Sequence, residues 1–128
     1  MFETLRHRYR QAVSRRREAK KRTTRSPQWA HVEKLHLALH PFCAGCGSQL
    51  HLQVHHKSPY RLHPERELDP TNLITLCLDT NECHLRIGHG DNFKAYNPNV
   101  IADCAASFAS PNQRKVIWAR AKAARLIV

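Results

Sequence analysis

The chain has 128 residues, and its 21 Lys and Arg residues outnumber its 10 Asp and Glu residues to give a formal net charge of +11. This length favours a single small domain, and the charge favours a polyanion, nucleic acid first, as the partner over a merely solvated surface. No apolar run is long enough to span a membrane and no signal peptide is recognisable, so we expect no membrane contact and a cytoplasmic protein.

Residues 1–26 make a basic arm, with ten Lys or Arg residues against two acidic ones. The helical spacing of apolar residues in its first half leaves two interpretations open, a helix docked on the domain or an arm that orders on nucleic acid. The basic clusters of this arm are predicted to bind nucleic-acid phosphates. They comprise Arg15, Arg16, Arg17, Lys20, Lys21 and Arg22.

Residues 27–92 are expected to hold the core of the domain. Ser26-Pro27 is typical of a helix start, and apolar spacing carries that helix to about Leu39. Alternation of apolar and polar residues over 50–56 predicts a half-buried strand, and the prolines of residues 57–71 predict a loop. A short apolar run that leads into Cys77 and a helix over about residues 82–88 follow.

Residues 93–128 are expected to form a helical extension that belongs to the same domain. Ser110-Pro111 repeats the helix-start signal and opens a last helix. The apolar side of this helix is predicted to consist of Ile117, Ala121, Ala124 and Val128. Basic residues line an adjacent side of this helix and are predicted to contact phosphates. They are Arg114, Lys122 and Arg125.

Four of the five cysteines form two pairs with metal-ligand spacing. Cys43 and Cys46 have the Cys-x2-Cys spacing that supplies two zinc ligands from a tight turn, and Cys77 and Cys83 form a looser second pair. These pairs predict one structural zinc ion with four cysteine ligands, in a reducing compartment. The alternative is that Cys77 or Cys83 is a plain buried cysteine. Cys104 has no partner and is expected in the core.

Histidines gather in the same part of the chain. His55-His56 end the predicted strand, and His84 and His89 follow Asn72. Phosphodiester hydrolysis needs a base that activates water and a cation that stabilises the phosphate and the leaving oxygen. Imidazole is a base suited to neutral pH, and neutral imidazoles also bind divalent metals. Adjacent histidines can divide these two roles, with purely structural histidines as the alternative.

The HNH endonuclease motif resembles five elements of this sequence, which occur in the same order over roughly residues 41–90. They are Cys43-x2-Cys46, Val54-His55-His56, Asn72-Leu73, Leu76-Cys77 and Cys83-His84. The resemblance implies an α+β fold, a small ββα-metal core, here with flanking N- and C-terminal helices and stapled by the structural zinc. It places the catalytic set of the motif on His56, Asn72 and His84.

By position, His56 resembles the general base that activates water, and Asn72 resembles the residue that orients this base. His55 and His84 resemble ligands of one catalytic divalent metal, which is Zn, Mn, Ni or Mg. His89 resembles a third ligand. His89 follows His84 by five residues, whereas a spacing of four would place both side chains on one helical face. His89 can therefore reach the metal only if the helix ends near Gly88.

The resemblance implies a metal-dependent endonuclease that nicks or cuts DNA and leaves 3′-hydroxyl and 5′-phosphate ends. Two alternatives remain open, a non-catalytic zinc-stapled module that binds nucleic acid and a nuclease directed at RNA. Small HNH proteins of phages and prophages are similar to this chain, and some assist genome packaging. By this association alone, the expected setting is a bacterial or phage-infected cell, with packaging machinery as a further partner.

Overall fold

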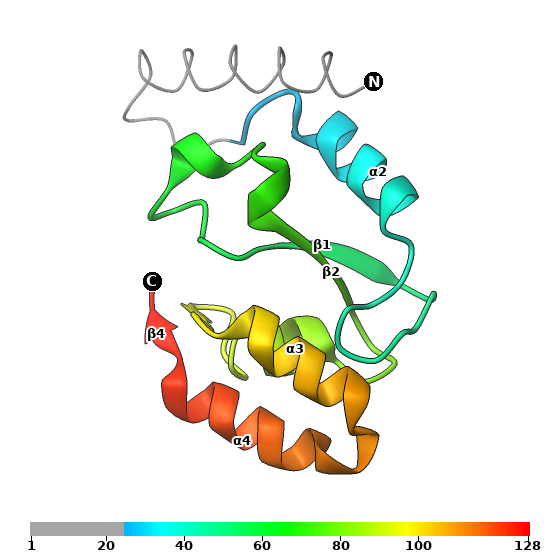
Figure 1. Cartoon of the computed structure of the whole chain (residues 1–128). Helices are drawn as coiled ribbons and strands as arrows, with labels where there is room; N and C mark the ends of the chain where they lie inside the picture. Colours follow the sequence, from blue (N-terminus) through cyan, green and yellow to red (C-terminus); the bar gives the residue numbers. More distant parts are fainter. Residues whose placement is uncertain (1–24) are drawn as a thin grey trace.

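The structure is a computed structural model that describes residues 25–128. The predicted N-terminal helix and its basic clusters lie outside these residues. None of the helices over residues 25–128 has the length and hydropathy of a membrane span. Figure 1 shows a β-hairpin across the middle of the molecule, with helix α2 (Trp29–Leu39) on one side and α3 (Val100–Ala109) and α4 (Arg114–Ala124) on the other.

Helix α2 begins at Trp29, two residues later than a cap at Ser26 predicts. The Ser26 hydroxyl accepts a hydrogen bond from the Gln28 amide at 3.2 Å, which closes a turn ahead of the helix instead of capping it. The helix buries Val32 and His36 against the hairpin. It ends close to Leu39, as predicted.

The hairpin consists of β1 (Leu52–His56) and β2 (Leu73–Cys77), which pair antiparallel with Leu52 opposite Cys77 and His56 opposite Leu73. The prediction that Leu50 starts the strand is wrong. Leu50 is 65% exposed, and His51 after it has a left-handed backbone with φ of 49°. This residue interrupts the extended conformation, so the strand starts beyond it.

Both faces of the hairpin are covered, because a separate core lies on each side. Val54, Leu68 and Leu73 pack with Val32 of α2 on one side. On the other side, buried cysteines pack with Leu76 and with residues of the C-terminal half. The strand is therefore buried on two faces near its end, which differs from the half-buried strand that simple alternation predicts.

The long connection between the two strands, predicted as a loop, contains two short helical turns. It contains the 3₁₀ turns η1 (Pro64–Arg66) and η2 (Pro70–Asn72), each opened by a proline at its first position. After β2, the predicted helix is a single π-helical turn, η3 (His84–Gly88). The amide of His89 donates to the carbonyl of His84 at 3.1 Å, an i to i+5 bond that defines this geometry.

The C-terminal part packs against η3 and the cysteine side of the hairpin. Helix α3 was not predicted, and α4 begins after the 3₁₀ turn η4 (Pro111–Gln113) that follows Ser110. Ile117 and Ala121 are buried, as the predicted apolar side requires, and Ala124 is only partly buried. The prediction that Val128 lies on this helix is wrong, because α4 ends at Ala124 and the chain turns into a short strand. The short strand β4 (Leu126–Ile127) returns to pair with β3 (Ala95–Tyr96), which brings the C-terminus beside the segment that follows η3.

Candidate metal centre and active site

The two adjacent histidines of β1 point to opposite faces because side chains alternate along a strand. His55 turns towards η3, where its ring centroid lies 5.0 Å from that of His84 and 4.8 Å from that of His89. His56 turns towards α2, where its ring lies 4.6 Å from that of Trp29. The strand therefore separates the two histidines for different roles while it keeps both at one end of the hairpin.

His55, His84 and His89 form a cluster that we call the histidine triad. One ring nitrogen from each lies within 4.8 Å of the others. The Nε2 atoms of His84 and His89 are 3.2 Å apart. In a tetrahedral site with metal–nitrogen distances of about 2.0–2.1 Å, the ligand nitrogens are roughly 3.3 Å apart, so the observed spacing fits a shared metal ion.

In His84 and His89, a hydrogen bond from Nδ1 determines that Nε2 is the ring nitrogen with the lone pair. His89 Nδ1 lies 2.7 Å from the carbonyl oxygen of Ala95, which can only accept, so Nδ1 carries the proton and Nε2 keeps a lone pair. His84 Nδ1 likewise donates to Gln53 Oε1 at 2.7 Å. Two lone pairs therefore face each other across 3.2 Å, an arrangement that a cation between them relieves.

A ring nitrogen of His55 lacks a hydrogen-bond partner among residues 25–128. His55 is 2% exposed, and its Nε2 is buried without a hydrogen-bond partner in the described part of the chain. A buried polar atom without a partner carries a free-energy cost of about 1–3 kcal/mol, which ligation of a metal by this nitrogen would remove. The donor set therefore fits a divalent metal that accepts imidazole ligands.

The π-helical turn explains how His89 joins the triad. Five residues separate His84 from His89, and an α-helix would place them on different faces. The i to i+5 bond of η3 adds one residue to the turn and brings the two rings to a centroid distance of 4.8 Å. The turn ends at Gly88, where a side chain would lie 3.1 Å from the His55 ring.

Burial keeps the triad unprotonated at neutral pH. It lowers the pKa of His84 to about 4 and that of His55 well below its ordinary value, and neighbouring histidine charges act in the same direction. The pKa of His89 is lowered by burial as well. Neutral imidazole is the form that binds metals, so the site is prepared for a cation.

His56 is held by a different set of contacts. Its Nε2 donates to the backbone carbonyl of Glu67 at 2.8 Å, which leaves Nδ1 as the nitrogen with a lone pair. Burial lowers the pKa of His56 to about 4, and the charge of Arg25 acts in the same direction against the hydrogen bond to Glu67. A neutral, oriented imidazole with one free nitrogen is the state that a general base requires.

Asn72 organises the loop that supplies this carbonyl. The side chain is fully buried; its Oδ1 accepts from the Ser58 amide at 2.7 Å, and its Nδ2 donates to the carbonyls of Ser58 and Arg66 at 3.1 Å each. Asn72 makes no contact with the triad among these bonds. Asn72 therefore joins Ser58 to Arg66 within the connection between the two strands. Arg66 directly precedes Glu67, whose carbonyl orients His56.

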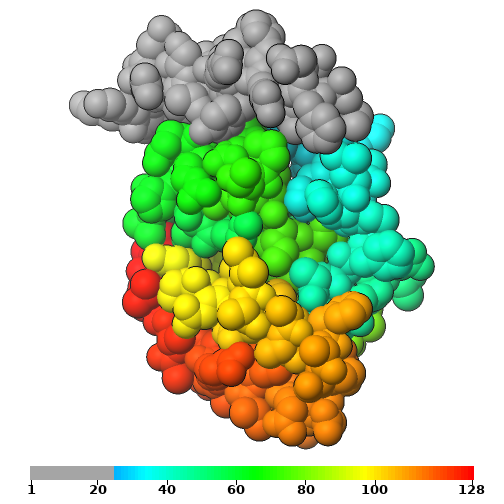
Figure 2. All heavy atoms as spheres, viewed as in Figure 1, coloured from blue at the N-terminus to red at the C-terminus, as the bar shows by residue number. Residues whose placement is uncertain are grey.

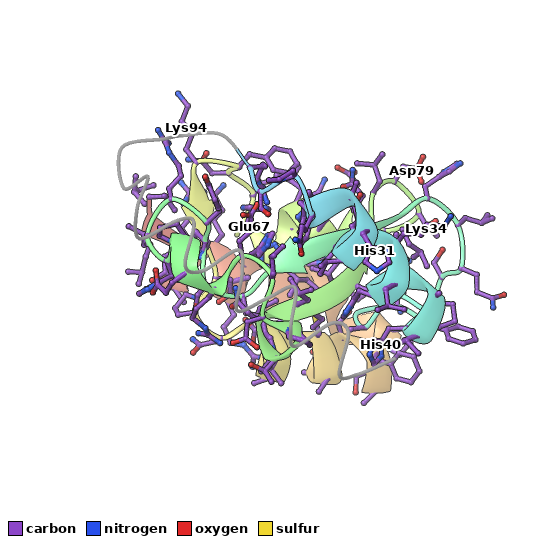
Figure 3. All side chains as sticks on the ribbon, turned by 90° about the horizontal axis from the view of Figure 1, so that it is seen from above. His31, Lys34, His40, Glu67, Asp79 and Lys94 are labelled. Carbon is purple, nitrogen blue, oxygen red and sulfur yellow. The ribbon has the colours of Figure 1, made fainter. Side chains whose placement is uncertain are left out.

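Glu67 has a second function in the same region. Its carboxylate is 2% exposed and accepts hydrogen bonds from the Ser26 amide at 3.1 and 3.3 Å. Figure 3 shows Glu67 in the interior of the molecule. Arg25 Nη1 lies 3.7 Å from it. The segment before α2 is thus anchored beside the loop whose carbonyl accepts from His56.

The four paired cysteines come together on the side of the hairpin that faces away from α2. Their sulfur atoms lie within 4.8 Å of one another, and those of Cys46 and Cys77 are 3.7 Å apart. Zinc–sulfur distances of about 2.3 Å place the sulfurs of a tetrahedral site roughly 3.8 Å apart. Hydrogen bonds from Cys43 and Cys83 hold the pKa of the Cys77 thiol far below its ordinary value, which favours a thiolate ready for zinc. Cys104 lies in the core beside this cluster, as expected.

A cavity of about 250 Å³ opens onto the histidines. All three triad residues and His56 line it, and its rim carries basic and aromatic side chains. The segments around residues 60 and 95 lie against each other on one side of the molecule in Figure 2, and both contribute to this rim. The rim residues are Arg25, Tyr60, Arg61, Phe93 and Lys94.

Sequence reasoning missed these rim residues and chose basic residues elsewhere. Arg114, Lys122 and Arg125 do not line the cavity. Arg114 donates to Ser107 and Arg125 donates to the Gly90 carbonyl, while Lys122 lies 3.9 Å from an Asp91 carboxylate oxygen and stays 60% exposed. The rim residues lie far apart in the sequence, and no local pattern marks them.

A comparison with known families matches residues 43–90 to the family described as HNH endonuclease. The matched segment runs from the first cysteine ligand candidate to the residue after His89. It therefore contains the hairpin, both cysteine pairs, the triad, His56 and Asn72. No curated protein and no solved structure matched the chain.

Proposed function

We propose that this chain, which carries an HNH endonuclease domain over residues 43–90, is a metal-dependent endonuclease that hydrolyses phosphodiester bonds of DNA. The observation that carries the proposal is the convergence of three histidine ring nitrogens within 4.8 Å of one another, beside an oriented fourth histidine. A zinc staple alone has no use for the histidine triad, because the four cysteines complete such a site by themselves.

In this proposal His55, His84 and His89 hold one divalent metal. When bound, the metal neutralises the scissile phosphate and stabilises the leaving 3′-oxygen. Gln53 and the Ala95 carbonyl keep the His84 and His89 rings oriented through their Nδ1 protons. Such partners tune both the orientation and the basicity of a ligand, and their loss reduces metal affinity about 10- to 100-fold.

His56 acts as the general base that takes a proton from the attacking water. Its Nε2 proton is committed to the Glu67 carbonyl, so Nδ1 receives the new proton. The Trp29 ring, 4.6 Å away, and the Glu67 carbonyl together restrict rotation of the imidazole. Asn72 acts through Glu67 as a positioning residue and does not touch the substrate.

Phosphates of the substrate are bound by the basic rim of the cavity. Lys94 and Arg61 carry charges to the mouth of the site, and the net charge of +11 draws the polyanion towards it. Arg114, Lys122 and Arg125 then extend the basic surface along and after α4, away from the cavity. Contacts to phosphates position the backbone and read little sequence.

The test is cleavage of supercoiled plasmid by the purified protein, in EDTA and then with added Mg, Mn, Ni or Zn. Metal-dependent conversion to nicked or linear DNA is expected, with His56→Ala inactive although folded and still bound to DNA. His31→Ala is the matched control, since His31 is exposed on α2 and does not line the cavity of the triad. Full cleavage by His56→Ala contradicts its role as the base.

Absence of cleavage under every metal has a different meaning. If the protein then binds DNA tightly and in a salt-dependent manner, it is a zinc-stapled binding module instead of a nuclease. Parallel incubation with structured RNA identifies an RNA-directed nuclease, because cleavage then depends on the same metal and on His56.

A further inference from the structure

Phe93 is an exposed aromatic residue at the histidine triad. Its ring centroid lies 5.0 Å from that of His89 and 6.0 Å from that of His84, yet the residue is 60% exposed. One part of the ring packs on the metal-ligand candidates and the remainder faces the cavity mouth. Exposed apolar residues are common on the surface of residues 25–128, but Phe93 is the one that also contacts the triad and lines its cavity, where a nucleotide could cover the ring.

The backbone around Phe93 is fixed before any substrate arrives. The Ala95 amide donates to the Asn92 carbonyl at 2.8 Å, and the Lys94 amide donates to Asn92 Oδ1 at 2.9 Å. The Val128 amide donates to the Lys94 carbonyl at 2.8 Å, which ties this turn to the C-terminal strand. A ring held in place in advance loses little conformational entropy when a ligand covers it.

Charges beside the ring complete a nucleotide-sized set of contacts. Lys94 follows Phe93 directly, and Figure 3 shows its side chain projecting from the edge of the molecule. Arg61 lines the same cavity. A flat aromatic surface next to basic side chains is the combination by which proteins bind unpaired strands, with bases stacked on rings and phosphates bound by the cations.

We propose that Phe93 is a stacking platform for the nucleobase that neighbours the scissile phosphate. The inference rests on the proposed nuclease function and adds a preference in the substrate. In an intact duplex, neighbouring base pairs cover both faces of each base, so the ring reaches a base only where the stack is open. Single-stranded or locally unstacked DNA is therefore the preferred substrate.

The experiment measures cleavage of two kinds of single-stranded oligonucleotide. One is intact, and the other is a series in which a single abasic residue is placed at successive positions on either side of the cut. Phe93→Ala is expected to lower kcat/KM on the intact strand roughly tenfold, because base–aromatic stacking is lost. An abasic residue at the stacking position is expected to lower the kcat/KM of the wild type by the same factor as Phe93→Ala does. It is expected to leave the kcat/KM of Phe93→Ala unchanged, because the stacking contact is already absent there. Phe93→Trp keeps the platform and retains activity, whereas Phe93→Leu loses it.

Two controls separate stacking from a structural role. Phe42→Ala removes a ring of similar exposure, 54%, that lines a different cavity, and it is expected to leave kcat/KM unchanged. Metal affinity, measured by competition with a chelator, is expected to be unchanged in Phe93→Ala. A ring that only shields the triad would alter metal affinity and would be replaced adequately by leucine.

The inference is overturned if Phe93→Ala loses the same factor on intact and abasic strands at every position, or if wild-type protein prefers duplex DNA. Normal cleavage by Phe93→Ala also overturns it and leaves the nuclease function intact. If no nucleic acid is cleaved, the proposed function fails. Fluorescence anisotropy of the same labelled strands then measures whether Phe93 contributes to binding. Equal affinity of wild type and Phe93→Ala then refutes the platform.

Discussion

Asn72→Ala is the substitution that most directly probes how the fold positions the catalytic base. Asn72 is fully buried and makes three hydrogen bonds of 2.7–3.1 Å to Ser58 and Arg66. A buried hydrogen bond contributes about 0.5–1.5 kcal/mol, and its loss costs more where the partner stays buried. The sum predicts that the variant loses about 3 kcal/mol of its free energy of unfolding.

The assay is denaturant unfolding of the zinc-loaded protein, followed by single-turnover cleavage under native conditions. Because Asn72 ties the loop that carries the Glu67 carbonyl, kcat is expected to fall at least about tenfold through misplacement of His56. Asn72→Asp keeps the shape but turns a carboxylate oxygen towards two carbonyls, so it should be no more stable than the alanine variant. A loss below about 1 kcal/mol with unchanged kcat refutes this reasoning.

Asn112→Ala serves as the control for these measurements. Asn112 is exposed on η4, far along the chain from the loop that holds His56. Surface substitutions of this kind change the free energy of unfolding by less than about 0.5 kcal/mol. A comparable loss in Asn112→Ala would show that the assay reports general fragility instead of the Asn72 network.

Three further perturbations test other parts of the structure. Cys83→Ser removes one of four clustered thiols and is expected to release zinc and lower the melting temperature sharply, whereas Cys104→Ala retains zinc in a metal-release assay. Gly90→Ala places a methyl group 2.8 Å from the main chain of α4 at φ of 58°, so thermal melts should show destabilisation of at least about 1 kcal/mol. Burial lowers the pKa of His36 to about 4, below its ordinary value of 6.5, so the unfolded chain binds more protons in this window. Stability should therefore fall by up to about 1.4 kcal/mol per pH unit from pH 6.5 towards 4 because of His36. Denaturant unfolding across this range should give a shallower slope for His36→Leu than for the wild type, and an unchanged slope contradicts this contribution.

Much of the metal chemistry was accessible from local spacing. The Cys-x2-Cys pair and the His55-His56 pair follow directly from the sequence, because a tight turn and an alternating strand have fixed side-chain geometry. The hairpin was implied by the resemblance to the HNH motif, because the apolar run before Cys77 is too short for periodicity to identify it as a strand. His89 lies within 4.8 Å of the other two candidate ligands, and its role as a ligand stays a prediction. The π-helical turn that brings it there was not predicted.

Other features depend on contacts that no local pattern encodes. Helix α3 carries Ile101 and Phe108 at 61% and 59% exposure, so its apolar residues do not follow one buried face and the helical periodicity is blurred. The link from Glu67 to His56 joins residues eleven positions apart through a backbone carbonyl, which leaves no signature in residue type. Phe93 lies beside the triad only because the turn after η3 folds back.

The most direct test of the central claim is plasmid nicking measured against the number of metal equivalents added to metal-free protein. Four thiolates bind zinc more tightly than three imidazoles, so the first equivalent fills the cysteine site and the second fills the triad. Nicking is expected to be absent at one equivalent of zinc and to rise as a second equivalent, of zinc or of another divalent metal, is added. It is also expected to be lost in His55→Ala at any ratio. Full nicking at one equivalent, or nicking by His55→Ala, would contradict a catalytic metal at the histidine triad.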